Sequence, residues 1–507
     1  MKRFATASAL ALVLSGPAYA DITPQQAWDS FEAYMAGFGY KVSATETGGG
    51  DTLTVSAITM TIPVPEEDAS VVVTMPDMTY TSAGDGSVDV SMPERSQVVV
   101  TFSENGEEQD GRIKLGMTHS GMAMNISGDE NDMHYTYSAD SLGVTLDEIE
   151  SPDEVLPPDV LKATVSMGPM AGTADVSKGT DRQTISQEVT YGDIAYDFAF
   201  KDPENAKSSG MLKGTLRGLA AAGETTVPLE LDYEDPAAMF AAGFAVDATM
   251  AHKGGTTEFN FVDGSDTVSG TLSSEAGELG MSMSQAAMTY ALSATGQTVS
   301  MTVPDMPFPI DARFGEAGFS IEVPLEKSET PKPAGLSILL ADFTMADMLW
   351  NIFDPGQTLP RDPATIGANV EAEVTPFVSL LDPDAIEAVE SQGGVPGELN
   401  ALTLSDLVIR AVGAELLGAG SFTFDNTDLE TFDGMPRPEG EVNLQVSGLN
   451  GLIDKLIAMG LVQEQDAMGA RMMLGMFTVP GAEPDTASST IEFNAQGQIL
   501  ANGQRIK

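Results

Sequence analysis

The sequence predicts a mainly β protein (α+β in the wider sense), built as a long antiparallel meander or extended sheets with a few amphipathic capping helices. The first observation is that apolar side chains alternate with Thr, Ser and acidic residues through most of residues 41–303, as in half-buried strands. The second is that clusters of Gly, Asp and Asn interrupt this alternation where hairpin turns are expected. The third is that helix signals are confined to a few short stretches.

Residues 1–20 are typical of a cleaved secretory signal. Lys2 and Arg3 precede an apolar run, and Ala18 and Ala20 form an A-x-A cleavage site. The run is shorter than the roughly 20 residues that a membrane-spanning helix needs. No cysteine follows the site, so no lipoprotein anchor is expected, and no later segment is apolar enough to cross a membrane. We therefore expect a soluble protein in the periplasm.

Composition excludes several classes of function. The formal net charge is −51, and no basic patch interrupts it, so binding to nucleic acid or to anionic lipid surfaces is not expected. The chain has no cysteine, which excludes disulfides, thiolate metal sites and cysteine nucleophiles. An exported chain without disulfides depends on buried core for stability, and this chain is long enough for two or more domains.

The N-terminal helix is the clearest local prediction. Thr23 is placed to cap it, Pro24 suits the first helical position, and Gln26 completes a capping box. An apolar stripe follows on one face, formed by Trp28, Phe31, Tyr34, Met35 and Phe38. We interpret the stripe as packing onto a sheet. A membrane-surface or partner helix is the alternative, although Asp29 and Glu32 disfavour an anionic membrane.

The β region carries two further signals. The apolar phase shifts within residues 51–64, which predicts a β-bulge. A Met-x-Tyr pattern followed by a turn and an alternating strand begins at Met78, Met133 and Met288. We interpret these three segments as recurring hairpins, with chance similarity among Thr-, Ser- and Met-rich strands as the alternative.

The chain is expected to divide after the signal into three parts. These are an N-terminal helix with a β domain over 21–230, a second β meander over 231–330 and a C-terminal β domain with a helical hairpin over 331–507. Asp235 and Pro236 predict a short helix at the start of the second part. The proline-containing stretch 325–336 marks the last boundary, and Thr344 is expected to cap a helix that ends at Asp354.

The last hundred residues have the most detailed local signals. Residues 402–424 predict two strands with a bulge near Gly418 and Gly420. Residues 449–462 predict a helix capped by Asn450 and ended by Gly460. A second helix is expected over 463–477, followed by a final strand pair; its broad apolar face consists of Met468, Met472, Met473 and Met476.

These segments resemble a known family. The motifs LTLSDLVIRAVGAELLGAG, FDGMPRPEGEVNL, KLIAMGLV and IEFNAQGQILANGQRIK, with MADMLWNIFDPGQTLPRDPATI upstream, are similar to the bacterial domain of unknown function 2125. The family has no established activity, so the resemblance implies no catalytic residues. The C-terminal end also resembles, more distantly, AsmA-type envelope proteins, which implies a link to lipid handling.

We find no pattern that predicts an enzyme. His119, His134 and His252 lie in separate expected strands without zinc-site spacing. There is no G-x-S-x-G elbow, Walker loop or dinucleotide fingerprint. By composition calcium is the metal most to be expected, with candidate stretches at 128–134, 262–266 and 425–428. Counted from Asp129, the first fails the EF-hand pattern, and we expect all three to be hairpin turns. We therefore expect no catalytic, cofactor-binding or metal-binding residues.

Methionine is abundant, with 28 residues, several in M-x-M pairs such as Met122 and Met124 or Met281 and Met283. Residues two apart on a strand share a face. Three interpretations stay open: a methionine-filled core, a deformable apolar groove, and a thioether Cu(I) site.

The leading functional hypothesis is a non-enzymatic periplasmic protein that binds a lipid or another hydrophobic envelope component on an apolar sheet groove. The alternative is a structural or interaction protein of the cell envelope that binds a protein partner and no small ligand. An open groove predicts a contiguous exposed apolar sheet face, whereas a closed sandwich would contradict the groove.

Overall fold

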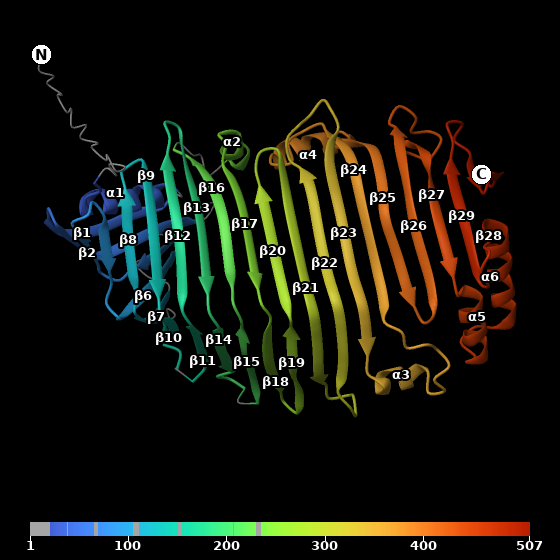
Figure 1. The fold of residues 1–507 in the computed structure, drawn as a ribbon, viewed down its shortest axis with the longest axis horizontal. Coiled ribbons are helices and arrows are strands. Elements are labelled where there is room, and N and C mark those ends of the chain that lie inside the picture. Colours follow the sequence, from blue (N-terminus) through green and yellow to red (C-terminus); the bar gives the residue numbers. More distant parts are fainter. Residues whose placement is uncertain are drawn as a thin grey trace, which may run out of the picture.

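The computed structural model describes residues 21–37, 39–64, 69–104, 111–150, 155–157, 159–205, 207–229 and 235–507. The expected signal (1–20) and Phe38 lie outside the described residues. The mainly β prediction is confirmed, because the described strands join into one antiparallel sheet. Figure 1 shows them side by side along the long axis, with the N-terminal strands at one end and the C-terminal helices at the other.

Two rows of hairpins, here called wall A and wall B, form the N-terminal half of the sheet. Wall A consists of β4 (Met78–Ser82), β5 (Val88–Ser91), β8 (Ala123–Gly128), β9 (Asp132–Ala139), β12 (Met170–Lys178), β13 (Arg182–Tyr191), β16 (Ala220–Pro228), β17 (Ala245–His252) and β20 (Ala276–Met283). Wall B consists of β3 (Ala69–Thr74), β6 (Arg95–Glu104), β7 (Gly111–Ser120), β10 (Ser141–Glu150), β11 (Leu161–Met167), β14 (Ile194–Lys201), β15 (Ser208–Leu216), β18 (Gly255–Asp263) and β19 (Asp266–Ser274).

The chain alternates between the walls, one hairpin at a time. For example, β12–β13 in wall A is followed by β14–β15 in wall B, and each new hairpin pairs with the previous hairpin of its own wall. Short connections such as Gly168–Pro169 and Gly192–Asp193 cross between the walls along a line that we call the crease. The hairpin turns lie on the edges opposite the crease. The edge of wall A is here called rim A, and the edge of wall B is called rim B.

Two strands take part in both walls. After the edge strand β1 (Lys41–Gly49), β2 (Thr52–Val64) pairs with β4 before Ala57 and with β3 after it. At the other end of the walls, β21 (Ala287–Thr302) pairs with β20 before Gly296 and with β19 after it. Ala57 and Gly296 have positive φ angles of 52° and 59°, which bend each strand at the crease. The predicted bulge in residues 51–64 is thus confirmed at Ala57.

Beyond β21 the walls merge into one curved layer of long strands. These are β22 (Ile310–Pro324), β23 (Lys332–Met345), β24 (Ala364–Pro376), β25 (Gly397–Ala411), β26 (Ala414–Asp425) and β27 (Arg437–Ser447), followed by β28 (Val479–Pro480), β29 (Thr486–Phe493), β30 (Ile499–Ala501) and β31 (Gln504–Arg505). Hydrogen-bonded pairing continues through the whole series. The predicted bulge near Gly418 and Gly420 lies opposite them, between Leu404 and Leu407 of β25.

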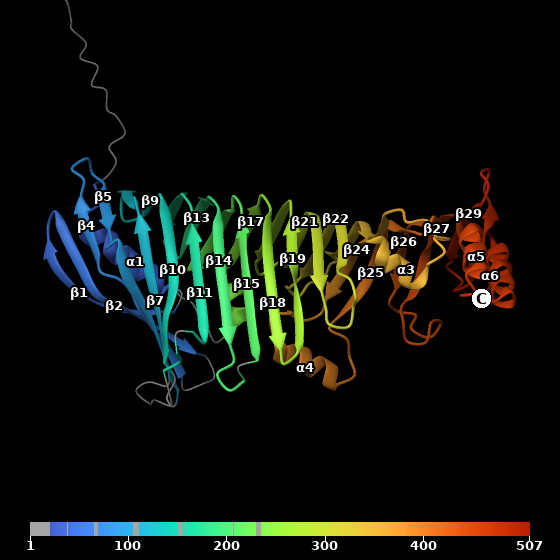
Figure 2. The same cartoon turned by 90° about the horizontal axis from the view of Figure 1, so that it is seen from below.

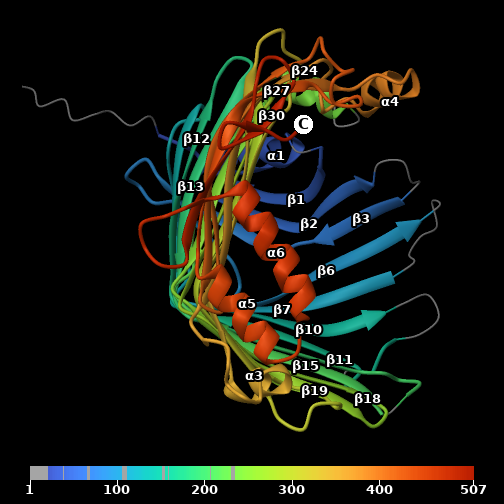
Figure 3. The same ribbon diagram turned by 90° about the vertical axis from the view of Figure 1, so that its right-hand side faces the viewer.

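The sheet has the shape of a trough. Figure 3, which looks along the long axis, shows the two walls meeting at an angle, and Figure 2 shows the strands of wall B following one another along the length. Strand register gives the trough one apolar and one polar face. In wall B, Phe200 and Phe261 flank Gly210 on one face, whereas Lys213 lies between Asp197 and Glu258 on the other.

Short helices lie at the ends and rims of the trough. They are α1 (Pro24–Ala36), α2 (Pro236–Ala241), α3 (Asp347–Phe353), α4 (Pro383–Ser391), α5 (Leu449–Ala458) and α6 (Glu464–Phe477). The Thr23 capping box is confirmed, as are the helix start at Asp235 and Pro236 and the left-handed end at Gly460. None of the described helices is long and apolar enough to span a membrane.

Three local predictions are wrong. Thr344 belongs to β23 and does not cap α3, because the strand continues to Met345 and Ala346 occupies the N-cap position. Asn450 lies inside α5, whose N-cap is Gly448. The recurring-hairpin interpretation holds only at Met78. The segment at Met133 crosses the crease between β9 and β10, and the segment at Met288 is the single strand β21.

Candidate functional site

The apolar face of the trough is covered at its N-terminal end. Helix α1 packs on it through Trp28, which is 0% exposed, and its ring lies 6.1 Å from that of Tyr80 and 5.4 Å from that of Phe31. Buried side chains of β2 and wall A complete this core, including Leu53, Val55, Val88, Val90 and Ile126. Burial and the neighbouring Tyr135 raise the pKa of the Tyr80 phenol. Figure 3 shows α1 inside the trough, so the apolar face is its concave face.

Beyond α1 the same face is exposed. In wall B, Phe200 and Phe261 are each 44% exposed, and on the long strands Ile338 reaches 44%. The other large apolar side chains between β14 and β25 that are more than one-third exposed on this face are Met250, Leu272, Met281, Leu292, Phe319, Leu336, Leu340, Ile366 and Ile409. Register places them side by side, as in Leu292 beside Phe319 and Phe319 beside Ile338. We call this open stretch, from β14 to β25, the groove.

The lining of the groove is almost free of charge. Between β14 and β27, the strand register places the Asp, Glu, Lys and Arg side chains of the strands on the convex face. The exceptions on the concave face are Asp263, Asp266 and Lys332, and all three lie at strand ends on a rim. A recess of about 370 Å³ extends the groove at rim A, between Val323, Val374, Leu380 and Leu399. The site therefore suits hydrocarbon and offers no charged partner along its length.

The three histidines occupy strands, as predicted, and the structure does not bring them together. His119 and His252 lie near the crease in different walls, and the Gly254 amide donates to Nδ1 of His252. His134 pairs with Asp175 at 2.7 Å on the convex face. No group of three or more His, Asp or Glu residues is placed to hold a metal ion within the described part of the chain.

All three acidic stretches are hairpin turns or turn loops, as predicted. In the first, the Asp129 carboxylate accepts the amides of Asn131 and Asp132. The second is the turn between β18 and β19, where Asp263 and Asp266 face each other across the ladder. The acidic side chains therefore serve turn geometry at the first site and flank the turn at the second.

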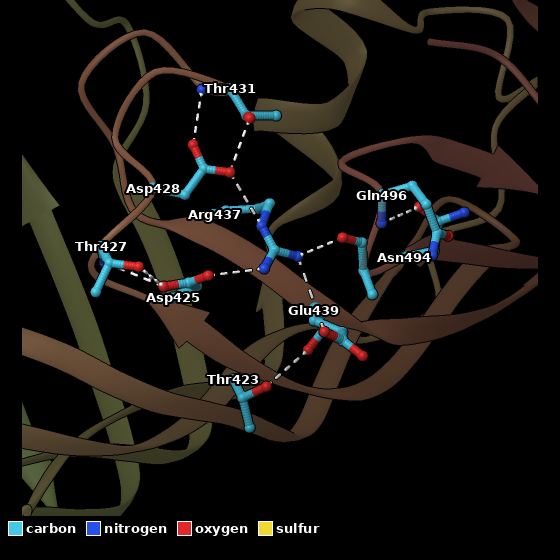
Figure 4. A network of polar contacts seen from close by, with 10 residues as sticks. Thr423, Asp425, Thr427, Asp428, Thr431, Arg437, Glu439, Asn494 and Gln496 are labelled. Carbon is cyan, nitrogen blue, oxygen red and sulfur yellow. Dashed lines mark hydrogen bonds and ion pairs between the residues drawn. The ribbon is translucent and has the colours of Figure 1, made fainter.

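The third stretch is held by an arginine. Figure 4 shows Arg437 between the carboxylates of Asp425, at 2.8 Å, and Asp428, at 3.1 Å. Hydrogen bonds from Thr427 and then Arg437 hold the pKa of Asp425 below its usual range, and the amide and hydroxyl of Thr431 lower that of Asp428. Arg437 also donates to the carbonyl of Ala495 at 2.9 Å, so the network joins the β26–β27 loop to the β29–β30 turn.

Methionines line the groove and an outer helix face. Met250 and Met281 are both more than 40% exposed and lie on neighbouring strands, with Met283 opposite Met288. This arrangement contradicts a closed, methionine-packed sandwich and fits an open apolar surface. The predicted methionine face of α6 is also exposed, with Met472 at 70%.

Sequence reasoning did not locate the groove or α4. The signal for α4 was available: Asp382 followed by Pro383 repeats the Asp235 and Pro236 start of α2, and the Asp382 carboxylate accepts the Ala385 amide. The groove has no local signal, because alternation looks the same whether a sheet face is covered or open.

Residues 215–503 match the family described as "Uncharacterized protein conserved in bacteria (DUF2125)". The chain belongs to this family. The matched residues run from the end of β15 to β30 and so include most of the groove. No curated protein and no solved structure matches the chain. The AsmA-type resemblance stays a hypothesis.

Proposed function

We propose that this DUF2125 protein is an exported, non-enzymatic periplasmic protein whose groove binds the hydrocarbon of a lipid or another hydrophobic envelope component. One observation carries the proposal: the concave face is apolar and open from β14 to β25, and its charged residues lie only at the rims. Soluble monomers rarely expose a contiguous apolar patch larger than a few hundred Å², and those that do usually use it for binding.

The energetics favour a long chain as the ligand. Each methylene buried on an apolar surface contributes about 0.8 kcal/mol, so a chain that lies along several strands gains affinity from its length. Strands lie ~4.8 Å apart, so a chain laid across four of them spans roughly 15 Å of the groove. The exposed Phe, Leu, Ile and Met side chains supply this surface without a specific polar anchor, and the flexible Met250 and Met281 adapt to chains of different shape.

The first test is native mass spectrometry, with organic extraction, of the protein purified from the periplasm. Reproducible co-purified lipid is the expected result. A clean apo mass, together with no uptake of a fluorescent zwitterionic lysophospholipid, would contradict the groove proposal and leave the structural or interaction alternative.

A pair of variants tests the location of binding. Ile338→Glu places a charge in the middle of the groove and should lower uptake of the fluorescent zwitterionic lysophospholipid at least tenfold, because burying an unpaired carboxylate is costly. Ser337→Glu places the same charge on the convex face, one residue away, and should leave uptake within twofold. Equal loss in both variants would locate binding elsewhere.

The interaction alternative has its own supporting feature. The outward face of α6 exposes Met468, Met472, Met473 and Met476, opposite the face that contains the buried Ala467. Such a face suits a protein partner. Loss of a co-purifying protein in Met472→Gln, with lipid uptake unchanged, would favour this role for α6.

A further inference from the structure

Carboxylates follow the exposed apolar side chains at rim B. Asp202 lies two residues beyond Phe200, Asp263 two beyond Phe261, and Asp266 two before Val268. Because strand side chains alternate, Asp263 and Asp266 extend the same concave face to the edge of the trough. They also face each other across the ladder, an arrangement of like charges that is unfavourable for the sheet itself.

Rim A is also negatively charged. Helix α4, which lies along this rim in Figure 1, carries Asp384, Glu387 and Glu390 after the capping Asp382, and no Lys or Arg. Lys332 is a basic exception at this edge of the concave face. A groove whose charged residues lie only at its edges is therefore bordered on both sides by net negative charge, and that arrangement constrains what the groove can hold.

We propose that the groove takes amphiphiles with a cationic or zwitterionic head group and discriminates against anionic ones. This inference rests on the proposed function. The lining offers no partner for a charged head group, so the head group must lie at a rim while the chain lies on the apolar face. At rim B an ammonium group meets the carboxylates of Asp263 and Asp266, whereas a lone phosphate or carboxylate is repelled.

A second copy of the chain fits this face less well. Two troughs that closed on each other would bring acidic rims of like sign together, and each chain carries a formal charge of −51. A lipid with an ammonium head group covers the same apolar surface and neutralises rim charge.

The test compares ligands with one hydrocarbon chain and three head groups. The full-length protein is titrated, below micelle formation, with hexadecyltrimethylammonium, palmitoyl-lysophosphatidylcholine and palmitoyl-lysophosphatidylglycerol. At ~10 mM salt, where screening extends over about 30 Å, we expect the anionic lipid to bind at least about tenfold more weakly than the other two. The difference should shrink to less than about threefold at ~0.3 M salt.

Paired variants separate a rim effect from total charge. Asp263→Asn with Asp266→Asn removes two rim charges. Glu224→Gln with Asp247→Asn removes a register-matched acidic pair from the convex face. The rim variant should improve binding of the anionic lipid about threefold, and the convex variant should change it by less than about 1.5-fold.

The outcomes are distinguishable. If all three ligands bind equally at low salt, or both double variants respond alike, the head-group inference is wrong and the groove proposal stands. If none of the three binds, the proposed function itself fails.

Discussion

Two regions of the concave face, its N-terminal end and the groove, differ in whether a helix covers them. At the covered end, Ile126 of wall A is 2% exposed because α1 and Trp28 lie over it. In the groove, Ile338 occupies an equivalent concave position on β23 and is 44% exposed. The alternation of apolar and polar residues is the same in both places, so the difference comes from the cover and not from the strands.

Apolar surface has different consequences in the two regions. Under α1 the side chains contribute to folding, because their area is removed from water by the chain itself. In the groove the sheet is held by its hydrogen-bonded ladder and by partial contact between neighbours, and much of its apolar area stays in contact with solvent. An apolar surface that the fold leaves exposed is available to a ligand, and substitutions there should affect binding more than stability.

The largest expected effect is at the covered end. Trp28→Ala should lower the free energy of unfolding by roughly 3–5 kcal/mol, because a fully buried indole is replaced by a cavity beneath α1. Urea unfolding, with hydrogen exchange of the wall A amides, measures the loss and its location. Trp350→Ala, on the partly exposed helix α3, is the matched control and should cost much less. A cost for Trp28→Ala below about 1 kcal/mol would show that α1 does not hold this end.

A smaller effect compares one truncation in two places. Ile126→Ala should cost about 2–4 kcal/mol and Ile338→Ala less than about 1 kcal/mol, because only the first side chain is fully enclosed. Ile338→Ala should instead weaken uptake of the fluorescent zwitterionic lysophospholipid, and Ile126→Ala should not. Equal destabilisation by the two variants would mean that the groove face is covered in solution, and the comparison would then fail.

Local rules predicted what depends on neighbours in sequence. The Thr23 capping box, the phase shift at Ala57 and the left-handed Gly460 all follow from short-range geometry, and the structure confirms them. Thr344 shows where these rules fail. It has the chemistry of a helix cap, but pairing of β23 with β22 extends through Met345 and takes precedence.

The long-range arrangement of the strands could not be predicted from the sequence, for a physical reason. The alternation between walls depends on short connections such as Gly192–Asp193, whose sequences resemble ordinary hairpin turns. Whether the chain returns beside its last strand or crosses the crease is decided by pairing with a hairpin formed earlier. The groove could not be predicted for the same reason, because it forms only when strands that are far apart in sequence lie side by side.

The smallest expected effect is at the C-terminal end, where a carboxylate holds a helix in place of an aromatic core. Asp485 accepts the amides of Asn450, at 3.0 Å, and Gly451, at 2.9 Å, at the start of α5. Burial opposes ionisation of Asp485, but the amides of Gly451 and Asn450, the Asn450 side chain and the charge of Arg471 together outweigh it and hold its pKa below the usual range. A lowered folded-state pKa stabilises the fold above the ordinary value near 3.9, and this contribution is lost as pH falls through the folded-state value.

Asp485→Asn tests this attachment with little change in shape, since Asn also tolerates the positive φ of 54° at this position. We expect a loss of about 0.5–1 kcal/mol at neutral pH, as for other helix-start contacts. The difference from the wild type should shrink as pH falls through the folded-state pKa of Asp485 and vanish below it, because protonation removes the same charge. Urea midpoints of both proteins across this pH range measure it. If the variant instead stays equally destabilised in acid, packing and not the charge of Asp485 anchors α5, and the two ends of the trough are then held in the same way.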